Sequence, residues 1–187
     1  MLNETIRSIL ERRSIRCYAP TPVEKDKLAL LLRCAQFAPS GMNRQPWHFT
    51  VVTNRDVLDQ ISAENKKVLL QSPDEGARLR AQDPAFDSFR GAPAAIIVSG
   101  EISERYATAD CANAVENMAI AAQSLGLGSV YLGSFKLALE TAAGAYLLDL
   151  LKIPPGFAPL YALSLGYSAE TLGERAPRRE NTITWIE

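Results

Sequence analysis

Histidine and cysteine are scarce in this chain of 187 residues. The single histidine is His48, and the three cysteines, Cys17, Cys34 and Cys111, lie far apart and form no CxxC pair. A zinc site needs more of these ligands, and a Ser-His-Asp or Cys-His arrangement needs a histidine beside its nucleophile. We therefore expect no bound metal, no catalytic side chain, reduced structural thiols and a structural role for His48.

An excess of charge of one sign and long apolar runs are also missing. Twenty Lys and Arg residues stand against 21 Asp and Glu residues, a formal net charge of −1, which argues against a surface for nucleic acid. No apolar stretch reaches the roughly 20 residues needed to cross a bilayer, and the charged, amphipathic segment 1–13 lacks the apolar centre of a secretory signal. We expect a cytoplasmic protein that binds neither membrane nor nucleic acid.

The length and the 47% hydrophobic content suit one hydrophobic core, so we expect a single domain over residues 1–187. Asn3 should cap a first helix, Thr21 a second through a capping box with Glu24, and Asn54 a short third one. The apolar spacing predicts further helices from Asp110 and over 137–151. Strands are expected over 47–53, after the glycines at 126–128, and over 94–99, 160–165 and 182–186.

Two of these segments need partners that the sequence does not identify. The last strand, 182–186, has no neighbour along the chain with which to pair, and a second subunit is one place for it. The polar stretch 72–91 suggests a lid or excursion, with a helical turn at 77–82. Its Phe86 and Phe89 either select an oxidant or pack beneath the loop.

Three segments carry groups or glycines that suit a ligand. Arg12–Arg16, with the sequence RRSIR, offers three guanidinium groups and a hydroxyl, either to a phosphate or to a helix C-terminus and solvent. Ala38–Trp47 is a proline-stiffened loop whose hydroxyl and amides suit either a planar heterocycle or their own backbone. The glycines of Ser124–Gly133 follow a helix and precede a strand, which is the reverse of the order in a dinucleotide-binding fingerprint.

In their order, RRSIR, APSGxNxQPW and SLGLGSVYLG, these segments resemble the FMN-dependent nitroreductase family, and the resemblance runs from Ile9 to about Trp185. It implies an α+β sandwich with a mixed, mainly antiparallel central sheet flanked by helices. It also implies a homodimer in which a C-terminal strand is exchanged between subunits.

The resemblance further implies which residues bind FMN. Positions that hold the phosphate, the ribityl chain and the pyrimidine edge of the flavin match Arg12, Arg13, Ser14 and Arg16. A loop that reaches the flavin bound mainly by the other subunit matches Pro39, Ser40, Asn43 and Gln45. Leu132 and Gly133 match a turn whose backbone lies near flavin N5. A basic tail residue at the phosphate matches Arg178, with Arg175 and Arg179 close by.

The activity implied by the resemblance is hydride transfer from NADH or NADPH to a nitroaromatic, a quinone or a related small-molecule acceptor in a ping-pong mechanism. The flavin carries the hydride, and a guanidinium at Arg16 would favour the negative charge of the reduced flavin. A dehydrogenase or dehalogenase acting on a dedicated metabolite is one alternative. A flavin-binding protein without catalysis is another.

Overall fold

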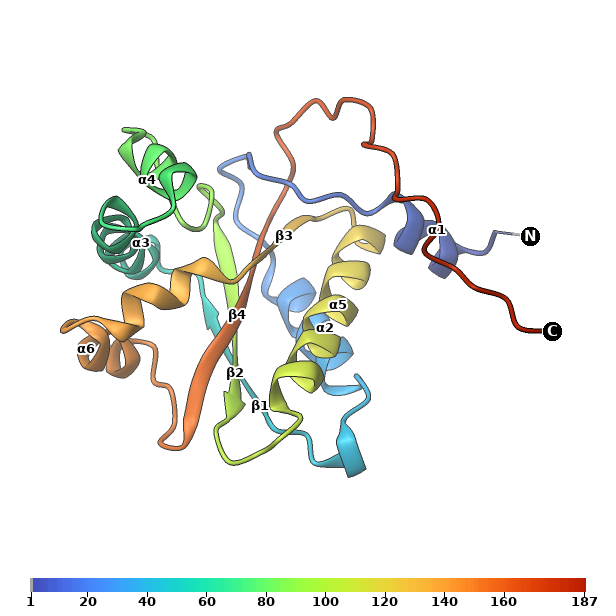
Figure 1. The fold of residues 1–187 in the computed structure, drawn as a ribbon, viewed down its shortest axis with the longest axis horizontal. Coiled ribbons are helices and arrows are strands. Elements are labelled where there is room, and N and C mark those ends of the chain that lie inside the picture. Colours follow the sequence, from blue (N-terminus) through green and yellow to red (C-terminus); the bar gives the residue numbers. More distant parts are fainter. Residues whose placement is uncertain (1) are drawn as a thin grey trace.

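A computed structural model describes residues 2–187, and it contains a four-stranded sheet with helices on both faces (Figure 1). The strands stand in the order β1-β2-β4-β3, and all three ladders between them are antiparallel. An isolated parallel bridge between Ser14 and Ser129 continues the sheet beyond β3. The α+β architecture with a mainly antiparallel sheet is confirmed. The strands are β1 (Trp47–Val52), β2 (Ala94–Glu101), β3 (Gly128–Leu132) and β4 (Phe157–Gly166).

The helices divide between the two faces of the sheet (Figure 1). One face is covered by α2 (Lys25–Gln36) and α5 (Ala107–Ser124), and α1 (Glu4–Glu11) contacts α5. The other face is covered by α3 (Arg55–Leu70), the 3-10 helix η2 (Ser134–Glu140) and α6 (Gly144–Leu150). Two further helices do not cover the sheet directly. They are α4 (Glu75–Gln82), which packs on α3, and the short 3-10 helix η1 (Gly41–Asn43).

The first five residues of β2, Ala94 to Val98, form an unbroken apolar run because the strand is covered on both faces. Ile96 and Val98 point into the core beneath α2 and α5, whereas Ala95 and Ile97 point into the core beneath α3 and α6. All four are fully buried. A strand covered on both faces has no solvent side, so it shows no alternation of polar and apolar residues.

The predicted helix starts are partly confirmed. The Asn3 side chain accepts a hydrogen bond from the Ile6 amide at 2.9 Å, and Asn54 caps α3 in the same way. The capping box at Thr21 is wrong, because α2 begins at Lys25 with Glu24 as its N-cap residue. The Glu24 carboxylate accepts a hydrogen bond from the Tyr167 hydroxyl at 2.9 Å, so it does not close a box with Thr21. Helix α3 is also longer than predicted, at 16 residues.

The single helix predicted over 137–151 is wrong as well. The segment contains the end of η2, an extended residue at Thr141 and then α6. The Thr141 hydroxyl accepts a hydrogen bond from the Ala143 amide at 3.2 Å, a local bond that competes with helix formation. At Gly144 a Cβ would lie 2.0 Å from the Leu139 carbonyl oxygen, so the tight turn between the two helices requires glycine.

The stretch 72–91 contains α4 and a structured loop. The Phe89 ring is fully buried and lies 5.8 Å from the ring of Phe135, measured between centroids. Phe86 packs against a small cluster formed by α3 and α4. The packing interpretation is therefore confirmed for Phe89, and Phe86 is partly buried against α3 and α4, whereas a role of the stretch as a lid stays a prediction.

The C-terminal segment 182–186 pairs with no strand within residues 2–187. Ile183 and Trp185 are 73% and 83% exposed, and the tail before them passes alongside α1 (Figure 1). Its exchange with a partner subunit stays a prediction.

The substitution Phe89→Ala should lower the free energy of unfolding by about 3–5 kcal/mol, because it removes a fully buried ring and leaves a cavity. Urea denaturation of the apoprotein measures this loss. Leu79→Ala, at an exposed position on α4, is the matched control and should cost less than about 0.5 kcal/mol. Equal effects of the two substitutions would contradict the placement of Phe89 in the core.

Candidate functional site

The segment Arg12–Arg16, called here the cationic segment, crosses the beginning of β3. The Ile15 amide donates a hydrogen bond to the Ser129 carbonyl oxygen at 2.9 Å. A Cβ on Gly128 would lie 2.8 Å from the Ile15 side chain, so only glycine at this position allows Ile15 to pack directly on the strand. The backbone of the cationic segment is thereby fixed to the sheet, while its guanidinium groups stay at the surface.

The C-terminal tail folds over the cationic segment. An Arg13 guanidinium nitrogen donates to the Gly173 carbonyl at 3.1 Å, and the Arg16 amide donates to the Glu170 carboxylate. In the opposite direction, Arg175 donates to the Arg12 carbonyl at 3.2 Å. Of the three tail arginines considered from the sequence, Arg175 is the one that these hydrogen bonds bring to the segment. Neither Arg178 nor Arg179 takes part in a hydrogen bond or ion pair within residues 2–187.

The loop 38–47 is held in an uncommon backbone conformation. Asn43 and Gln45 both have positive φ angles, 56° and 51°. The Ser40 hydroxyl accepts a hydrogen bond from the Gln45 amide at 3.0 Å, and the Gln45 side chain donates to Asn43 at 3.2 Å. These polar groups, predicted from the sequence as ligand-binding candidates, therefore lie together on one ordered turn.

Helix α5 anchors this loop. The buried Asp110 carboxylate accepts the Gly41 amide with both oxygens, at 3.1 and 3.2 Å, and Asn113 donates to the Pro39 carbonyl at 3.4 Å. A carboxylate that holds a backbone amide in a buried position forms a strong, charge-assisted hydrogen bond. The loop is consequently attached to the first turns of α5.

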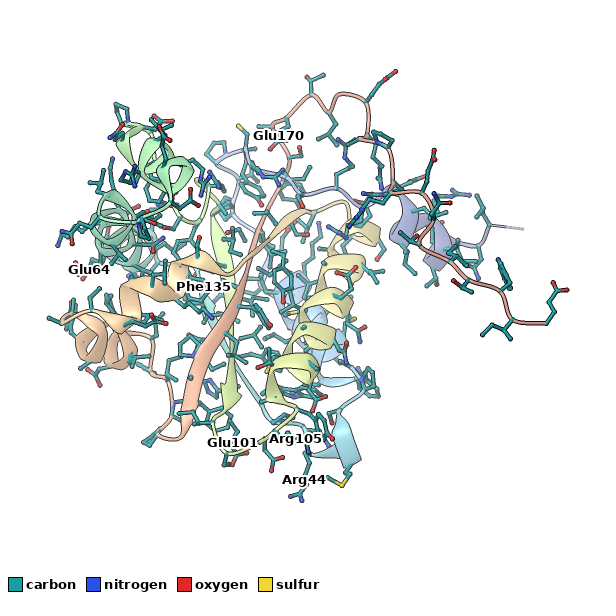
Figure 2. The ribbon with its side chains drawn as sticks, in the orientation of Figure 1. Arg44, Glu64, Glu101, Arg105, Phe135 and Glu170 are labelled. Carbon is teal, nitrogen blue, oxygen red and sulfur yellow. The ribbon has the colours of Figure 1, made fainter. Side chains whose placement is uncertain are left out.

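The loop and the cationic segment lie toward opposite ends of α5. Figure 2 shows Arg44, which belongs to the loop, at one end of the molecule and Glu170, the partner of Arg16, at the other. An α-helix rises about 1.5 Å per residue, so the 18 residues of α5 are about 27 Å long. The Arg12 side chain nevertheless reaches the middle of α5, where it pairs with Glu116 at 3.6 Å, and Glu116 lies about 9 Å along the helix from Asp110.

Leu132 and Gly133 close the other end of β3. Leu132 is buried in the core beneath α3 and α6, whereas a Cβ on Gly133 would meet no atom within 4 Å. The backbone of Gly133 thus borders open space. Strands rise about 3.3 Å per residue, so Gly133 lies about 13 Å from Ser129, where the cationic segment begins to cross the sheet. The structure brings these two predicted parts of the site together along one strand.

A further cation, Arg90, was missed in the sequence. Arg16 and Arg90 line one cavity of about 340 Å³ together with Ala85, Asp87 and Gly91. Burial raises the pKa of the nearby Tyr18, and Glu170 raises it further, while the charges of Arg16 and Arg90 both oppose this shift. The signal that could have found Arg90 is an Arg-Gly pair followed closely by a proline and a strand, which is typical of a tight turn.

The Cys111 thiol and the His48 imidazole contribute to packing. Burial, with a smaller contribution from Asp110, raises the pKa of the Cys111 thiol to about 12, so this thiol is neutral at physiological pH. The His48 ring lies 6.0 Å from the ring of Phe157. Within residues 2–187, no group of three or more His, Cys, Asp or Glu side chains is placed to hold a metal ion, and no helix is long and apolar enough to span a bilayer.

Comparison with known proteins agrees with this geometry. The sequence profile of the nitroreductase family matches residues 9–167. This chain belongs to the nitroreductase family. Two nitroreductases solved with bound FMN, from Bacteroides fragilis and Desulfitobacterium hafniense, are 32% and 30% identical to it, each with a TM-score of 0.92 and 100% of both chains covered. The FMN reductase [NAD(P)H] of Bacillus subtilis is 30% identical over 182 residues, which are 90% of this chain and 68% of that protein.

In this nitroreductase family member, Asp110→Ala should release the loop 38–47. The Gly41 amide loses a charged acceptor, which costs about 1.5–3 kcal/mol and corresponds to a tenfold to hundredfold faster amide exchange. Hydrogen exchange followed by NMR measures the exchange rate of the Gly41 amide. Asp149→Ala, at an exposed position on α6 across the sheet, is the control and should leave Gly41 unchanged. Unchanged exchange in Asp110→Ala would show that the loop keeps its shape without this carboxylate.

Proposed function

We propose that this chain is an FMN-dependent oxidoreductase that transfers hydride from NADH or NADPH to a nitroaromatic, a quinone or a related small-molecule acceptor by a ping-pong mechanism. The observation that carries the proposal is the arrangement along β3, where the cationic segment and the open backbone of Gly133 lie about 13 Å apart. The full-length similarity to two FMN-bound nitroreductases supports the same function. A location in the cytoplasm is part of the proposal.

The phosphate and ribityl chain of FMN are assigned to the cationic segment. Guanidinium groups bind phosphate with two parallel hydrogen bonds, and the segment presents Arg12, Arg13 and the Ser14 hydroxyl close together. Arg175 joins them from the tail, because its guanidinium already reaches the Arg12 carbonyl. We assign the pyrimidine edge of the flavin to Arg16.

Gly133 is assigned to the reactive edge of the flavin ring. Its backbone borders open space, so its N–H can approach a ligand more closely than one shielded by a side chain. Bound FMN supplies the hydride chemistry itself. The chain's own contribution is to bind and orient the ring and to leave one face open to NAD(P)H and the acceptor in turn.

The second half of each site comes, in this proposal, from a partner subunit in a homodimer. The loop residues Pro39, Ser40, Asn43 and Gln45 are attached to the first turns of α5, whereas the backbone of the cationic segment is bound to β3 at Ser129. Exposed apolar side chains on α1 and on the C-terminal segment support a dimer that buries them and exchanges segment 182–186. They are Ile6, Ile9 and Leu10 of α1 with Leu2 just before it, and Ile183, Trp185 and Ile186 of the C-terminal segment.

Arg16→Ala should weaken FMN retention by tenfold to hundredfold, the loss expected for a charged hydrogen bond. The protein is incubated with FMN, desalted, and its visible spectrum is recorded before and after NADH or NADPH is added without oxygen. Arg80→Ala, at an exposed position on α4, is the control and should retain FMN like the wild type. Equal retention in Arg16→Ala and the wild type would overturn the assignment of Arg16.

The same spectra test the activity. We expect the bound flavin to bleach with NAD(P)H and to recover its colour when a quinone is added. Flavin that binds but does not bleach would identify the non-catalytic alternative. Bleaching without turnover of quinones and nitroaromatics would favour a dehydrogenase or dehalogenase of a dedicated metabolite.

A mixing experiment tests the shared site. One variant carries Arg12→Ala and Arg16→Ala, and the other carries Ser40→Ala and Asn43→Ala. Each homodimer should bind FMN poorly, whereas mixed dimers contain one site that lacks no residue, so statistical mixing should restore about a quarter of the wild-type flavin content. Circular dichroism confirms that both variants fold. A monomer in gel filtration, or no recovery on mixing, would contradict the shared site.

A further inference from the structure

The loop that carries Arg90, residues 83–91, is held in place by hydrogen bonds within the loop and by hydrogen bonds to α3 and β4. The Asp87 carboxylate accepts hydrogen bonds from the Phe89 amide at 2.8 Å and from the Gly91 amide at 2.6 Å. It also forms an ion pair with Arg55. Both oxygens of Asp87 are thus engaged in holding the loop, and little of its charge remains for a ligand.

Buried groups hold the loop from below. The Ser88 amide donates to the Ser62 hydroxyl at 2.9 Å, and Asn65 donates to the Ser88 hydroxyl at 2.8 Å. The Ser164 hydroxyl of β4 donates to the Phe89 carbonyl at 3.0 Å. With the Phe89 ring fully buried, the position of the next residue, Arg90, is fixed relative to the sheet.

Arg90 adopts a backbone conformation that favours glycine. Its φ angle is +63°, and Gly91 follows with +69°. A side chain in the left-handed region is strained, and glycine is not. The position nevertheless holds a long, exposed cationic side chain. A residue that strains the backbone inside a well-anchored loop points to a role for its side chain.

Arg90 faces the same cavity as Arg16. Neither guanidinium forms an ion pair with a carboxylate within residues 2–187, and Arg16 donates to the Ser14 carbonyl at 3.1 Å. Two carboxylates lie nearby: Asp87, which lines the cavity and binds backbone amides of its own loop, and Glu170, which accepts the backbone amide of Arg16. Both arginine side chains line this one cavity, Arg16 from the cationic segment and Arg90 from the loop before β2. Two cations that share one cavity repel each other unless an anion lies between them.

We propose that Arg90 is a second cation of the flavin site and that, together with Arg16, it stabilises the negative charge at the pyrimidine edge of reduced FMN. This inference rests on the proposed function. The oxidised ring carries no charge at that edge, so the contribution of Arg90 is selective for the reduced form. Asp87 is the positioning residue that holds Arg90 in its left-handed conformation.

The substitution Arg90→Gly removes the positive charge and leaves the backbone conformation of the loop unchanged. Glycine fits the φ angle, so the apoprotein should unfold at the same temperature or a higher one. Affinity for FMN reduced with dithionite should fall about tenfold, while affinity for oxidised FMN changes by less than about threefold. Anaerobic titrations with each form of FMN measure the two dissociation constants.

Arg90→Lys keeps the charge and the backbone strain, and it should retain most of the preference for reduced FMN. Arg80→Gln removes a positive charge from α4 and should leave both affinities unchanged. Equal losses for both forms of FMN in Arg90→Gly, no loss, or a lower unfolding temperature of the apoprotein would overturn the role of Arg90. A wild-type protein that binds no FMN would instead overturn the proposed function.

Discussion

The burial of β2 and β4 between two apolar layers is the constraint on which the rest of the structure depends. Because both faces of these strands are covered, the sheet offers functional groups only at its edges and ends. The edge strand β3 carries the cationic segment at its beginning and the open backbone of Gly133 at its end. A rigid strand thus sets the spacing between the cationic segment, proposed to bind the phosphate, and Gly133, proposed to orient the ring, which suits a ligand with a charged end and a flat end.

Helix α5 determines the positions of the loop 38–47 and the cationic segment relative to each other. The loop 38–47 is attached to its first turns through Asp110, whereas Arg12 of the cationic segment pairs with Glu116 near the middle of the helix. The same helix that organises one face of the core therefore holds the loop and contacts the cationic segment at different turns. A two-fold related copy can bring the loop of one chain to the cationic segment of the other, because an isologous interface presents each element to its counterpart twice.

Two carboxylates, Asp110 and Asp87, serve the site in the same indirect way. Each accepts backbone amides of a loop that contains residues with positive φ angles, and each leaves the exposed side chains of that loop free to meet a ligand. The free-energy cost of the strained backbone conformations in these loops is offset by the charged hydrogen bonds that the two carboxylates accept. Neither carboxylate needs to touch the ligand, because the oxygens of each are engaged by backbone amides of its loop.

The sequence by itself determined the features that depend on neighbouring residues: the caps at Asn3 and Asn54, the apolar run of β2, and the order of motifs that identifies the family. Only the tertiary structure decided features that depend on distant contacts. Tyr167 engages Glu24 from 143 positions away, so α2 starts at Lys25 rather than after Thr21. Arg90 and Arg16 line one cavity because the loop before β2 and the cationic segment lie side by side in the folded chain. Local propensity is encoded within a few residues, whereas cavities and shared charges arise only after the chain has packed.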